Sequence, residues 1–265
     1  MKIPTDDVND TFYATPRTTA GESLRFYTDS GGATIIFAGV TPGGTLPALS
    51  CDAFIPLPAA PGFRVAPDTM RKQLLVDDPA QSGVLGALWL DGRTWTWDYP
   101  GRALYWRANG DVPRVPQDHT VALGFQKQDG KHTTGFPRVT AQIDGVSYDF
   151  LLDTGAMSLV SGQLRASSFI TASIAARWHA MHPDWPYRKG AEGRSHADMI
   201  RVDNVRIGGF DSGPAWFAVR PDANFTHFMS QWMDKPVVGS IGGSALHDLR
   251  MTVDYTAEKA YFERP

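Results

Sequence analysis

The chain of 265 residues carries a formal net charge of −3, with 25 Lys and Arg residues against 28 Asp and Glu residues. This balanced charge gives no basis for a nucleic-acid or anionic-membrane partner. The length suits one large domain or two small ones, and the single cysteine excludes an intrachain disulfide. Apolar runs such as residues 33–40 are far shorter than the ~20 residues that span a bilayer, so we expect no membrane insertion.

In chain order, the first predicted elements are two strands that end at a carboxylate. Residues 12–36 contain a strand, a glycine turn, a second apolar strand and then Asp29-Ser30-Gly31. Residues 83–106 contain a glycine turn, a short apolar helix and two further strands. Residues 108–117, which hold two prolines, are predicted to form a linker.

Both segments recur in the second half of the chain. Residues 136–160 repeat residues 12–36 at an offset of 124, which aligns Asp153-Thr154-Gly155 with the first Asp-Ser-Gly. Residues 239–262 repeat residues 83–106 at an offset of 156, with seven of 24 positions identical, where average usage would give roughly one or two. The offset grows by 32 residues, so we predict one fold unit used twice, with the second copy enlarged.

Local context assigns several other residues to structural roles. Asp211-Ser212-Gly213 is a third tripeptide of the same type, but no apolar strand leads into it, so a loop is predicted. Asp98 and Asp254 each precede a tyrosine at a strand–turn junction and are predicted to form turns. Residues 171–182 are predicted to form a surface helix, and its histidines have no further ligand at the spacing that a metal site needs.

The two repeated Asp-Ser-Gly and Asp-Thr-Gly loops carry the predicted chemistry. Asp29 and Asp153 each end an apolar strand, and two such loops that meet at a pseudo-two-fold axis would bring the carboxylates together. Like charges that close share one proton. The ionised member can then take a proton from water while the protonated member donates to a carbonyl oxygen. Ser30 and Thr154 are predicted to support the loops by hydrogen bonds, and Gly31 and Gly155 by allowing close approach of the backbone.

The repeated motifs resemble the retropepsin and pepsin superfamily of aspartic peptidases, and especially its bacterial retropepsin-like members. The resemblance rests on the Asp-Thr-Gly-Ala run that starts at Asp153, on Gly239 and Gly242, and on the Asp-Tyr pairs near the end of each copy. It covers the second copy nearly end to end, whereas residues 39–82 match poorly. Retropepsins pair two chains with one Asp loop each, and pepsins carry two lobes in one chain. The resemblance implies the pepsin arrangement with lobes of retropepsin size.

The resemblance also implies a flap that covers the substrate. Pepsins have a flap tyrosine in the first lobe, but no tyrosine lies between Tyr27 and Tyr99. Either Phe54 or Phe63 covers the cleft in its place, or the first lobe lacks a pepsin-like flap. In the second copy the glycine-rich residues 190–196 fall where a flap tip is expected, and a plain mobile loop is the alternative. The candidate flap residues are Gly190, Gly193, Arg194 and Ser195.

Together these observations predict an all-β protein with two pseudo-symmetric, pepsin-like β-barrel lobes, a cleft between them and a few short helices. The predicted lobes are residues 1–112 and 113–265. The predicted function is that of an aspartic endopeptidase that acts as a monomer on an extended peptide or protein substrate, bound as an added strand, without cofactor or metal. No signal peptide is apparent at the N-terminus, and the resemblance favours a periplasmic over a cytoplasmic location.

Two alternatives remain at this stage. One is an inactive protein of the same fold whose cleft binds a peptide or glycan, which the poorly matching first-lobe flap would favour. The other is a homodimeric peptidase that pairs two Asp153 loops and uses the first copy only as a structural element.

Overall fold

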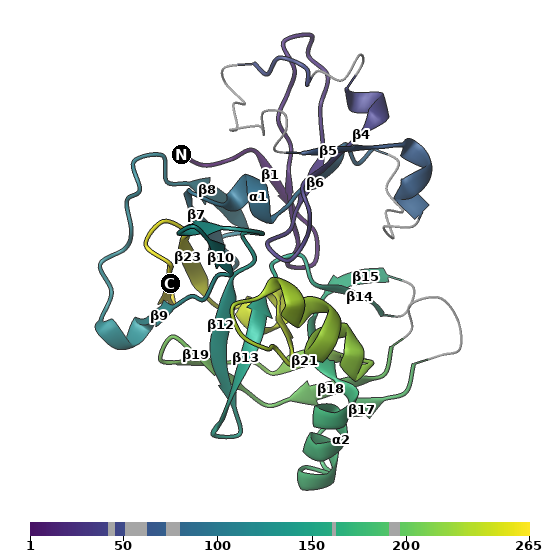
Figure 1. Ribbon diagram of the computed structural model, residues 1–265, viewed down its shortest axis with the longest axis vertical. Coiled ribbons are helices and arrows are strands. Elements are labelled where there is room, and N and C mark those ends of the chain that lie inside the picture. Colours follow the sequence, from purple (N-terminus) through teal and green to yellow (C-terminus); the bar gives the residue numbers. More distant parts are fainter. Residues whose placement is uncertain (42–45, 51–62, 73–79, 161–162, 191–196) are drawn as a thin grey trace.

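The computed structural model of the chain describes residues 1–41, 46–50, 63–72, 80–160, 163–190 and 197–265. Strands dominate these residues, and helices are short (Figure 1). The strands of the first half are β1 (Thr5–Asp7), β2 (Phe12–Ala14), β3 (Phe26–Thr28), β4 (Ile35–Phe37), β5 (Arg64–Ala66), β6 (Gly83–Leu85), β7 (Thr94–Asp98) and β8 (Ala103–Trp106). Its helical turns are α1 (Ala87–Leu90), η1 (Ala38–Val40) and η4 (Asp68–Lys72).

The second half has more and longer elements. Its strands are β9 (Thr120–Ala122), β10 (Lys127–Gln128), β11 (Lys131–His132), β12 (Arg138–Ile143), β13 (Val146–Leu152), β14 (Met157–Val160), β15 (Gln163–Ala166), β16 (Ser168–Thr171), β17 (Tyr187–Arg188), β18 (Met199–Val202), β19 (Val205–Ile207), β20 (Phe210–Ser212), β21 (Ala215–Arg220), β22 (Gly239–Ile241), β23 (Arg250–Asp254) and β24 (Lys259–Glu263). Its helices are α2 (Ala172–Met181), α3 (Gly243–Leu246), η5 (Gln117–His119), η6 (Asn224–Met229) and η7 (Ser230–Trp232). The prediction of an all-β fold with few short helices is confirmed.

Three larger sheets organise the described residues. The first copy contributes a six-stranded sheet in the order β1-β2-β3-β6-β4-β5, which lies at the top of Figure 1. The second copy contributes a nine-stranded sheet in the order β17-β18-β21-β16-β22-β13-β12-β19-β20. A five-stranded sheet, β8-β7-β23-β24-β9, takes strands from both halves of the chain. The first and second halves are therefore joined by backbone hydrogen bonds as well as by the connecting segment.

The strands around each predicted carboxylate are connected in the same way. In the first copy β6 pairs parallel with β3 and antiparallel with β4. In the second copy β22 pairs parallel with β13 and antiparallel with β16. The first glycine of each Gly-x-x-Gly lets the paired strands approach closely. A Cβ on Gly83 would lie 3.0 Å from Ile36 Cα, and one on Gly239 would lie 3.1 Å from Ile170 Cα. The repeat predicted from sequence is thus a repeat of topology.

A pseudo-two-fold axis passes between the two copies at Thr96 and Thr252. The antiparallel register of β7 with β23 pairs Thr96 with Thr252, and residues on either side pair symmetrically about this point. The two hydroxyl groups are 2.7 Å apart and fully buried. Thr96 and Thr252 are equivalent residues of the two copies at the offset of 156. The axis therefore passes between a residue of the first copy and the same residue of the second.

A continuous core of aromatic and aliphatic side chains supports the strands of both copies. Its largest fully buried members include Trp89, Trp95, Trp97 and Trp178. Asp98 and Asp254 form turns as predicted, because each accepts a backbone N–H three residues on, from Gly101 and Ala257. Asp98 also accepts a hydrogen bond from Arg250 at 2.8 Å, a contact that crosses between the copies.

The ungapped offset of 124 is wrong at its C-terminal end. The structure aligns Ile36 with Ile170, because these two residues pair with the equivalent glycines Gly83 and Gly239. The sequence alignment had matched Ile36 to Val160. The second copy inserts the β14–β15 hairpin, residues 157–166, between the carboxylate loop and the next strand of the common topology. This hairpin accounts for ten of the 32 additional residues.

The loop predicted at Asp211-Ser212-Gly213 is also wrong. Asp211 and Ser212 belong to β20, which pairs with β19. The strand was missed because its apolar alternation is only three residues long. Asp211 is exposed and lies 3.3 Å from Arg206, so it has no access to the loops at Asp29 and Asp153.

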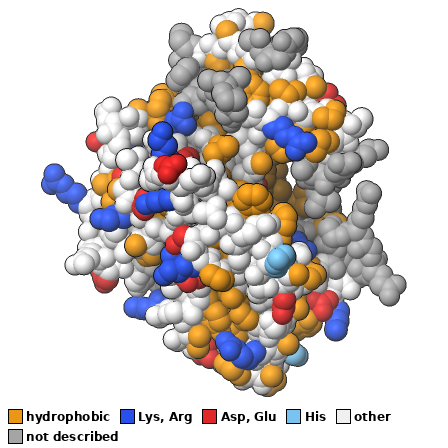
Figure 2. All heavy atoms as spheres, viewed as in Figure 1, with side chains coloured by type: hydrophobic (Ala, Val, Ile, Leu, Met, Phe, Trp, Pro, Cys, Tyr) orange, Lys and Arg blue, Asp and Glu red, His pale blue; other side chains and the backbone are white. Residues whose placement is uncertain are grey.

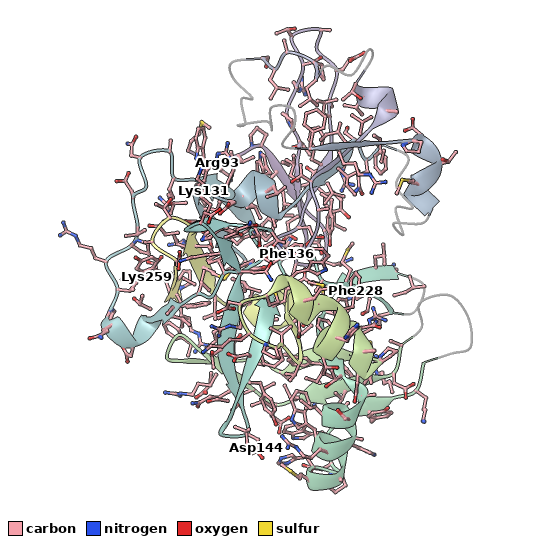
Figure 3. The ribbon with its side chains drawn as sticks, in the orientation of Figure 1. Arg93, Lys131, Phe136, Asp144, Phe228 and Lys259 are labelled. Atoms are coloured by element: carbon pink, nitrogen blue, oxygen red, sulfur yellow. The ribbon has the colours of Figure 1, made fainter. Side chains whose placement is uncertain are left out.

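Residues 108–116 form neither strand nor helix, in agreement with the predicted linker, and Gln117 begins η5. The lobe boundary between residues 112 and 113 stays a prediction. The surface helix predicted at residues 171–182 is α2, and His182 at its end contacts Asp144, which lies at the tip of the β12–β13 hairpin (Figure 3). Among the described residues, no helix has the length and apolar character that crossing a bilayer requires.

Candidate active site

Asp29 and Asp153 are placed by equivalent backbone hydrogen bonds. Each follows the last residue of a buried strand, β3 or β13. The Asp29 amide donates to Leu85 O at 3.0 Å, and the Asp153 amide donates to Ile241 O at 2.8 Å. Leu85 and Ile241 end the equivalent strands β6 and β22. The parallel strand pair of each copy therefore fixes where its carboxylate loop begins.

The two carboxylate loops are linked by reciprocal hydrogen bonds. The Ser30 amide donates to Thr154 Oγ1 at 3.2 Å, and the Thr154 amide donates to Ser30 Oγ at 2.9 Å. The Ser30 hydroxyl also donates to Leu152 O at 2.6 Å. Ser30 and Thr154 are 1% and 2% exposed, so these bonds are shielded from water. The structure thus brings together the four residues Asp29, Ser30, Asp153 and Thr154.

The two glycines of the loops face the opposite carboxylates. A Cβ on Gly31 would lie 2.6 Å from Asp153 Cγ, and a Cβ on Gly155 would lie 2.6 Å from Asp29 Oδ1. Any side chain at either position would occupy the space of the facing carboxylate. The glycines are therefore needed for close approach of the two loops, and not for an unusual backbone angle, since neither has a positive φ.

The carboxyl groups of Asp29 and Asp153 are brought together by the loops, since each lies against the glycine of the opposite loop. Burial, the negative charge of Asp29 and the hydrogen bond with Asp29 raise the pKa of Asp153 well above its ordinary value. Burial also raises the pKa of Asp29, but the hydrogen bond with Asp153 and the amides of Gly31 and Gly32 act in the opposite direction. The Gly31 amide donates to Asp29 Oδ1 at 2.9 Å. Both pKa values are raised, so the pair keeps one shared proton at a pH where a free Asp would be ionised.

Sequence reasoning missed two side chains beside the pair. The Tyr27 hydroxyl, at the end of a buried ring, donates to the Gly155 carbonyl and so braces the second loop from the first copy. Ser240 is fully buried on β22, near Asp153, and lowers the pKa of that carboxyl. Its hydroxyl has no other hydrogen-bond partner of standard geometry in the described part of the chain. Tyr27 could have been noticed in sequence, because Leu151 stands at the matching position of the second copy.

The candidate flap lies partly outside the described residues. Gly193, Arg194 and Ser195 are among residues 191–196, which the structure does not describe. Gly190 is described, and its amide donates to Asp198 Oδ1 at 2.8 Å. The flanking strands β17 and β18 pair antiparallel, with Arg188 opposite Met199, so the candidate flap residues connect the two strands of a hairpin.

In the first copy, Phe54 lies outside the described residues, as do most of the neighbouring positions. Phe63 is described, and it packs half-buried against the main core. Figure 2 shows a surface hollowed between the upper part, which the first-copy strands form, and the lower part. Basic and acidic side chains are interspersed over this face (Figure 2). Within the described residues, no group of three His, Cys, Asp or Glu side chains is arranged to hold a metal ion.

Loss of the Ser30 hydroxyl is expected to destabilise the protein. Ser30→Ala would leave the buried Thr154 amide and Leu152 carbonyl without their present partner, and each unsatisfied buried group costs about 1–3 kcal/mol. We expect a fall of about 2–4 kcal/mol in the free energy of unfolding. Ser30→Thr keeps the hydroxyl found at the equivalent Thr154 and serves as the control. Urea denaturation of both variants measures the difference, and equal stability of Ser30→Ala and wild type would contradict the role of this bond.

The raised pKa of the buried pair gives stability a definite pH dependence. A carboxyl group whose folded-state pKa is raised binds its proton more tightly in the folded state, so its contribution is favourable in acid and is lost as pH rises through that pKa. In Asp153→Asn this titration is absent. The unfolding temperature of wild type relative to Asp153→Asn should therefore fall as pH rises above about 4, the ordinary value for Asp. Thermal unfolding of both proteins between pH 3 and 8 measures this, and a difference independent of pH would contradict the raised pKa.

A comparison with known proteins found matches to this chain among solved structures. A retropepsin-like aspartic protease from Rickettsia conorii shares 18% identity and a TM-score of 0.33, over 54% of this chain and 93% of that one. Basic 7S globulin from soybean shares 12% identity and a TM-score of 0.48, over 98% of this chain and 93% of that one. No family model matches the sequence, and no curated protein matches it.

Proposed function

We propose that the protein is an aspartic peptidase in which Asp29 and Asp153 form the catalytic pair. The observation that carries this proposal is the joining of the two carboxylate loops, with Ser30 and Thr154 exchanging hydrogen bonds and each glycine facing the opposite carboxylate. In a structural ion pair a cation stabilises the acid, whereas the charged group that acts on Asp153 here is a second acid, Asp29. Such a pair is costly in folding and is characteristic of acid–base catalysis.

In the proposed reaction, ionised Asp29 accepts a proton from a water molecule that attacks the peptide carbonyl carbon. Protonated Asp153 donates to the carbonyl oxygen as the tetrahedral intermediate forms. Collapse of that intermediate breaks the carbon–nitrogen bond: Asp29 gives its proton to the leaving amine, and one hydroxyl of the intermediate returns a proton to Asp153 as the carboxyl product forms. The pair then has its starting protonation again. General acid and base assistance of this kind contributes about 10²–10⁴ in rate.

The arrangement also supports action as a monomer, because both loops come from one chain. An extended peptide would lie along the hollow between the copies, with the β17–β18 hairpin on one side. The homodimeric alternative requires two Asp153 loops to meet, yet the position facing Asp153 is occupied by Asp29 and Gly31 of the same chain. The alternative of an inactive binding protein rests on the first-copy flap region, which is mostly outside the described residues.

The direct test is hydrolysis of a mixed peptide library at pH 3–7, with products identified by mass spectrometry. We expect internal peptide bonds to be cleaved with an optimum in the acidic range, where one proton is shared by the pair. The molar mass of the active species, measured by light scattering on the assayed sample, is expected to be close to the 29.0 kDa of one chain. Absence of cleavage across this range by folded protein would remove the peptidase assignment.

A further inference from the structure

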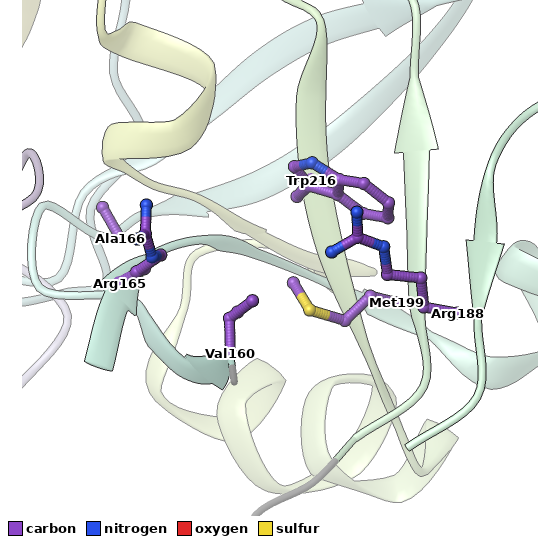
Figure 4. A pocket seen from close by; sticks show the side chains of 6 residues that line it. All are labelled: Val160, Arg165, Ala166, Arg188, Met199 and Trp216. Atoms are coloured by element: carbon purple, nitrogen blue, oxygen red, sulfur yellow. The ribbon is translucent and has the colours of Figure 1, made fainter. Parts of the chain in front are cut away.

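A pocket beside the candidate active site combines two arginines with an apolar floor (Figure 4). It has a volume of about 320 Å³. Arg165 and Ala166 of β15 line one side, and Arg188, Met199 and Trp216 of three adjacent strands line the other, with Val160 of β14 below. Met199 is buried and Trp216 is half-buried, so an apolar surface is available between the two charged groups.

Neither arginine has an acidic partner among the residues that the structure describes. Arg165 donates to Gln163 Oε1 at 3.3 Å, and Arg188 lies 4.6 Å from the ring of Trp216 in a cation–π contact. By contrast, Arg138, Arg206, Arg250 and Arg264 of the same half each form an ion pair with an Asp. A guanidinium group held flat on an aromatic ring keeps its N–H edge free to bind a carboxylate with two hydrogen bonds.

The pocket is connected to the catalytic loop through the inserted hairpin. Met157, four residues after Asp153, pairs with the pocket residue Ala166. The following residue, Ser167, donates its amide to Ala156 O, next to the loop. On the far side, Arg188 and Met199 face each other in the hairpin that carries the candidate flap. An extended peptide that runs from the Asp pair along this hairpin would bring the side chain of a residue flanking the cleaved bond to the pocket.

We infer that this pocket is a specificity subsite that binds an acidic side chain, Asp or Glu, of the peptide substrate between Arg165 and Arg188. The inference rests on the proposed peptidase function and adds a substrate class to it. The aliphatic part of a glutamate would lie against Met199 and Trp216, while its carboxylate would contact both guanidinium groups. The first copy lacks the β14–β15 hairpin, so the preference applies to one side of the cleaved bond only.

The test compares peptides that are identical except for Glu or Gln at each position flanking the cleaved bond. We expect kcat/KM to be about three- to tenfold higher for Glu at one position, the effect of two partly exposed ion pairs. The preference should weaken with added salt, and it should disappear below about pH 4, where the substrate glutamate is protonated. If the arginines only stabilised the fold, the ratio of kcat/KM for Glu and Gln peptides would depend on neither salt nor pH.

Charge reversal provides the decisive variants. Arg165→Glu with Arg188→Glu should abolish the preference for Glu over Gln, measured as the ratio of kcat/KM within the variant, and should favour Lys at the same position. Arg114→Glu reverses one charge on the exposed linker, as each single variant Arg165→Glu or Arg188→Glu does in the pocket, and should keep the Glu preference. Cleavage without any Glu preference in wild type would overturn the subsite while leaving the peptidase assignment intact. If no peptide is cleaved, calorimetric binding of the same Glu and Gln peptides tests the pocket independently, and equal affinities would overturn it.

Discussion

Asp29→Asn and Asp153→Asn are each expected to lower peptide hydrolysis by about 10²–10⁴-fold or more. Asparagine keeps the shape of the side chain but can neither accept the proton of the attacking water nor donate as a carboxylic acid. Because the two groups act as a unit, the double variant should be little worse than either single variant. The rates are measured on the best peptide from the library, and circular dichroism with thermal unfolding checks that each variant is folded.

Asp211→Asn is the matched control for these variants. Asp211 also begins an Asp-Ser-Gly sequence, but it is exposed on β20 and paired with Arg206. We expect wild-type activity from it. Wild-type activity in either Asp29→Asn or Asp153→Asn would break the proposed pair. Loss of activity in Asp153→Asn alone would instead favour the dimeric arrangement in which the first copy is only structural.

Gly31→Ala and Gly155→Ala are expected to inactivate the protein with both carboxylates still present. The new methyl group would lie 2.6 Å from Asp153 Cγ in the first variant and 2.6 Å from Asp29 Oδ1 in the second. The loops must move apart to admit it, and overpacking of this kind costs about 1–3 kcal/mol. A displacement of about 1 Å in a reacting group can cost about 10²-fold in rate. We therefore expect a loss of at least about that size in kcat.

Gly110→Ala separates this effect from ordinary destabilisation. Gly110 has a φ of 71° and no atom within 4 Å of a Cβ built on it, so alanine there strains the backbone without touching the site. It should cost about 1 kcal/mol of stability and leave kcat unchanged. Retention of full kcat by Gly31→Ala or Gly155→Ala would show that close approach of the two loops is not required.

The sequence predicted the repeat well because its markers are residues with no substitute. Gly83 and Gly239 lie where neighbouring strands approach closely. The Asp loops recur with a hydroxyl residue and a glycine after each Asp. The pairing of Ser30 with Thr154 followed from this symmetry alone. A residue that has the same structural role in both copies can be found by aligning the sequence with itself.

The remaining features are those in which the copies differ, and self-alignment cannot find them. The β14–β15 hairpin shifted the register of the second copy by ten residues, so Ile36 was matched to Val160 and not to Ile170. Tyr27 has Leu151 as its counterpart, and its hydrogen bond to Gly155 depends on how the copies pack. The subsite formed by Arg165 and Arg188 requires the inserted β14–β15 hairpin to lie opposite β17, β18 and β21, which the sequence alone does not show.

The pairing of Thr96 with Thr252 has a consequence for how such a chain could originate. Its register is unchanged when the two copies are exchanged, which is the property of an interface between identical subunits related by a two-fold axis. A single ancestral unit could therefore have assembled with itself through this strand before its gene was duplicated and fused. Only after fusion could one half change without the other, and the inserted hairpin, Tyr27 and the two unpaired arginines are all changes of that one-sided kind.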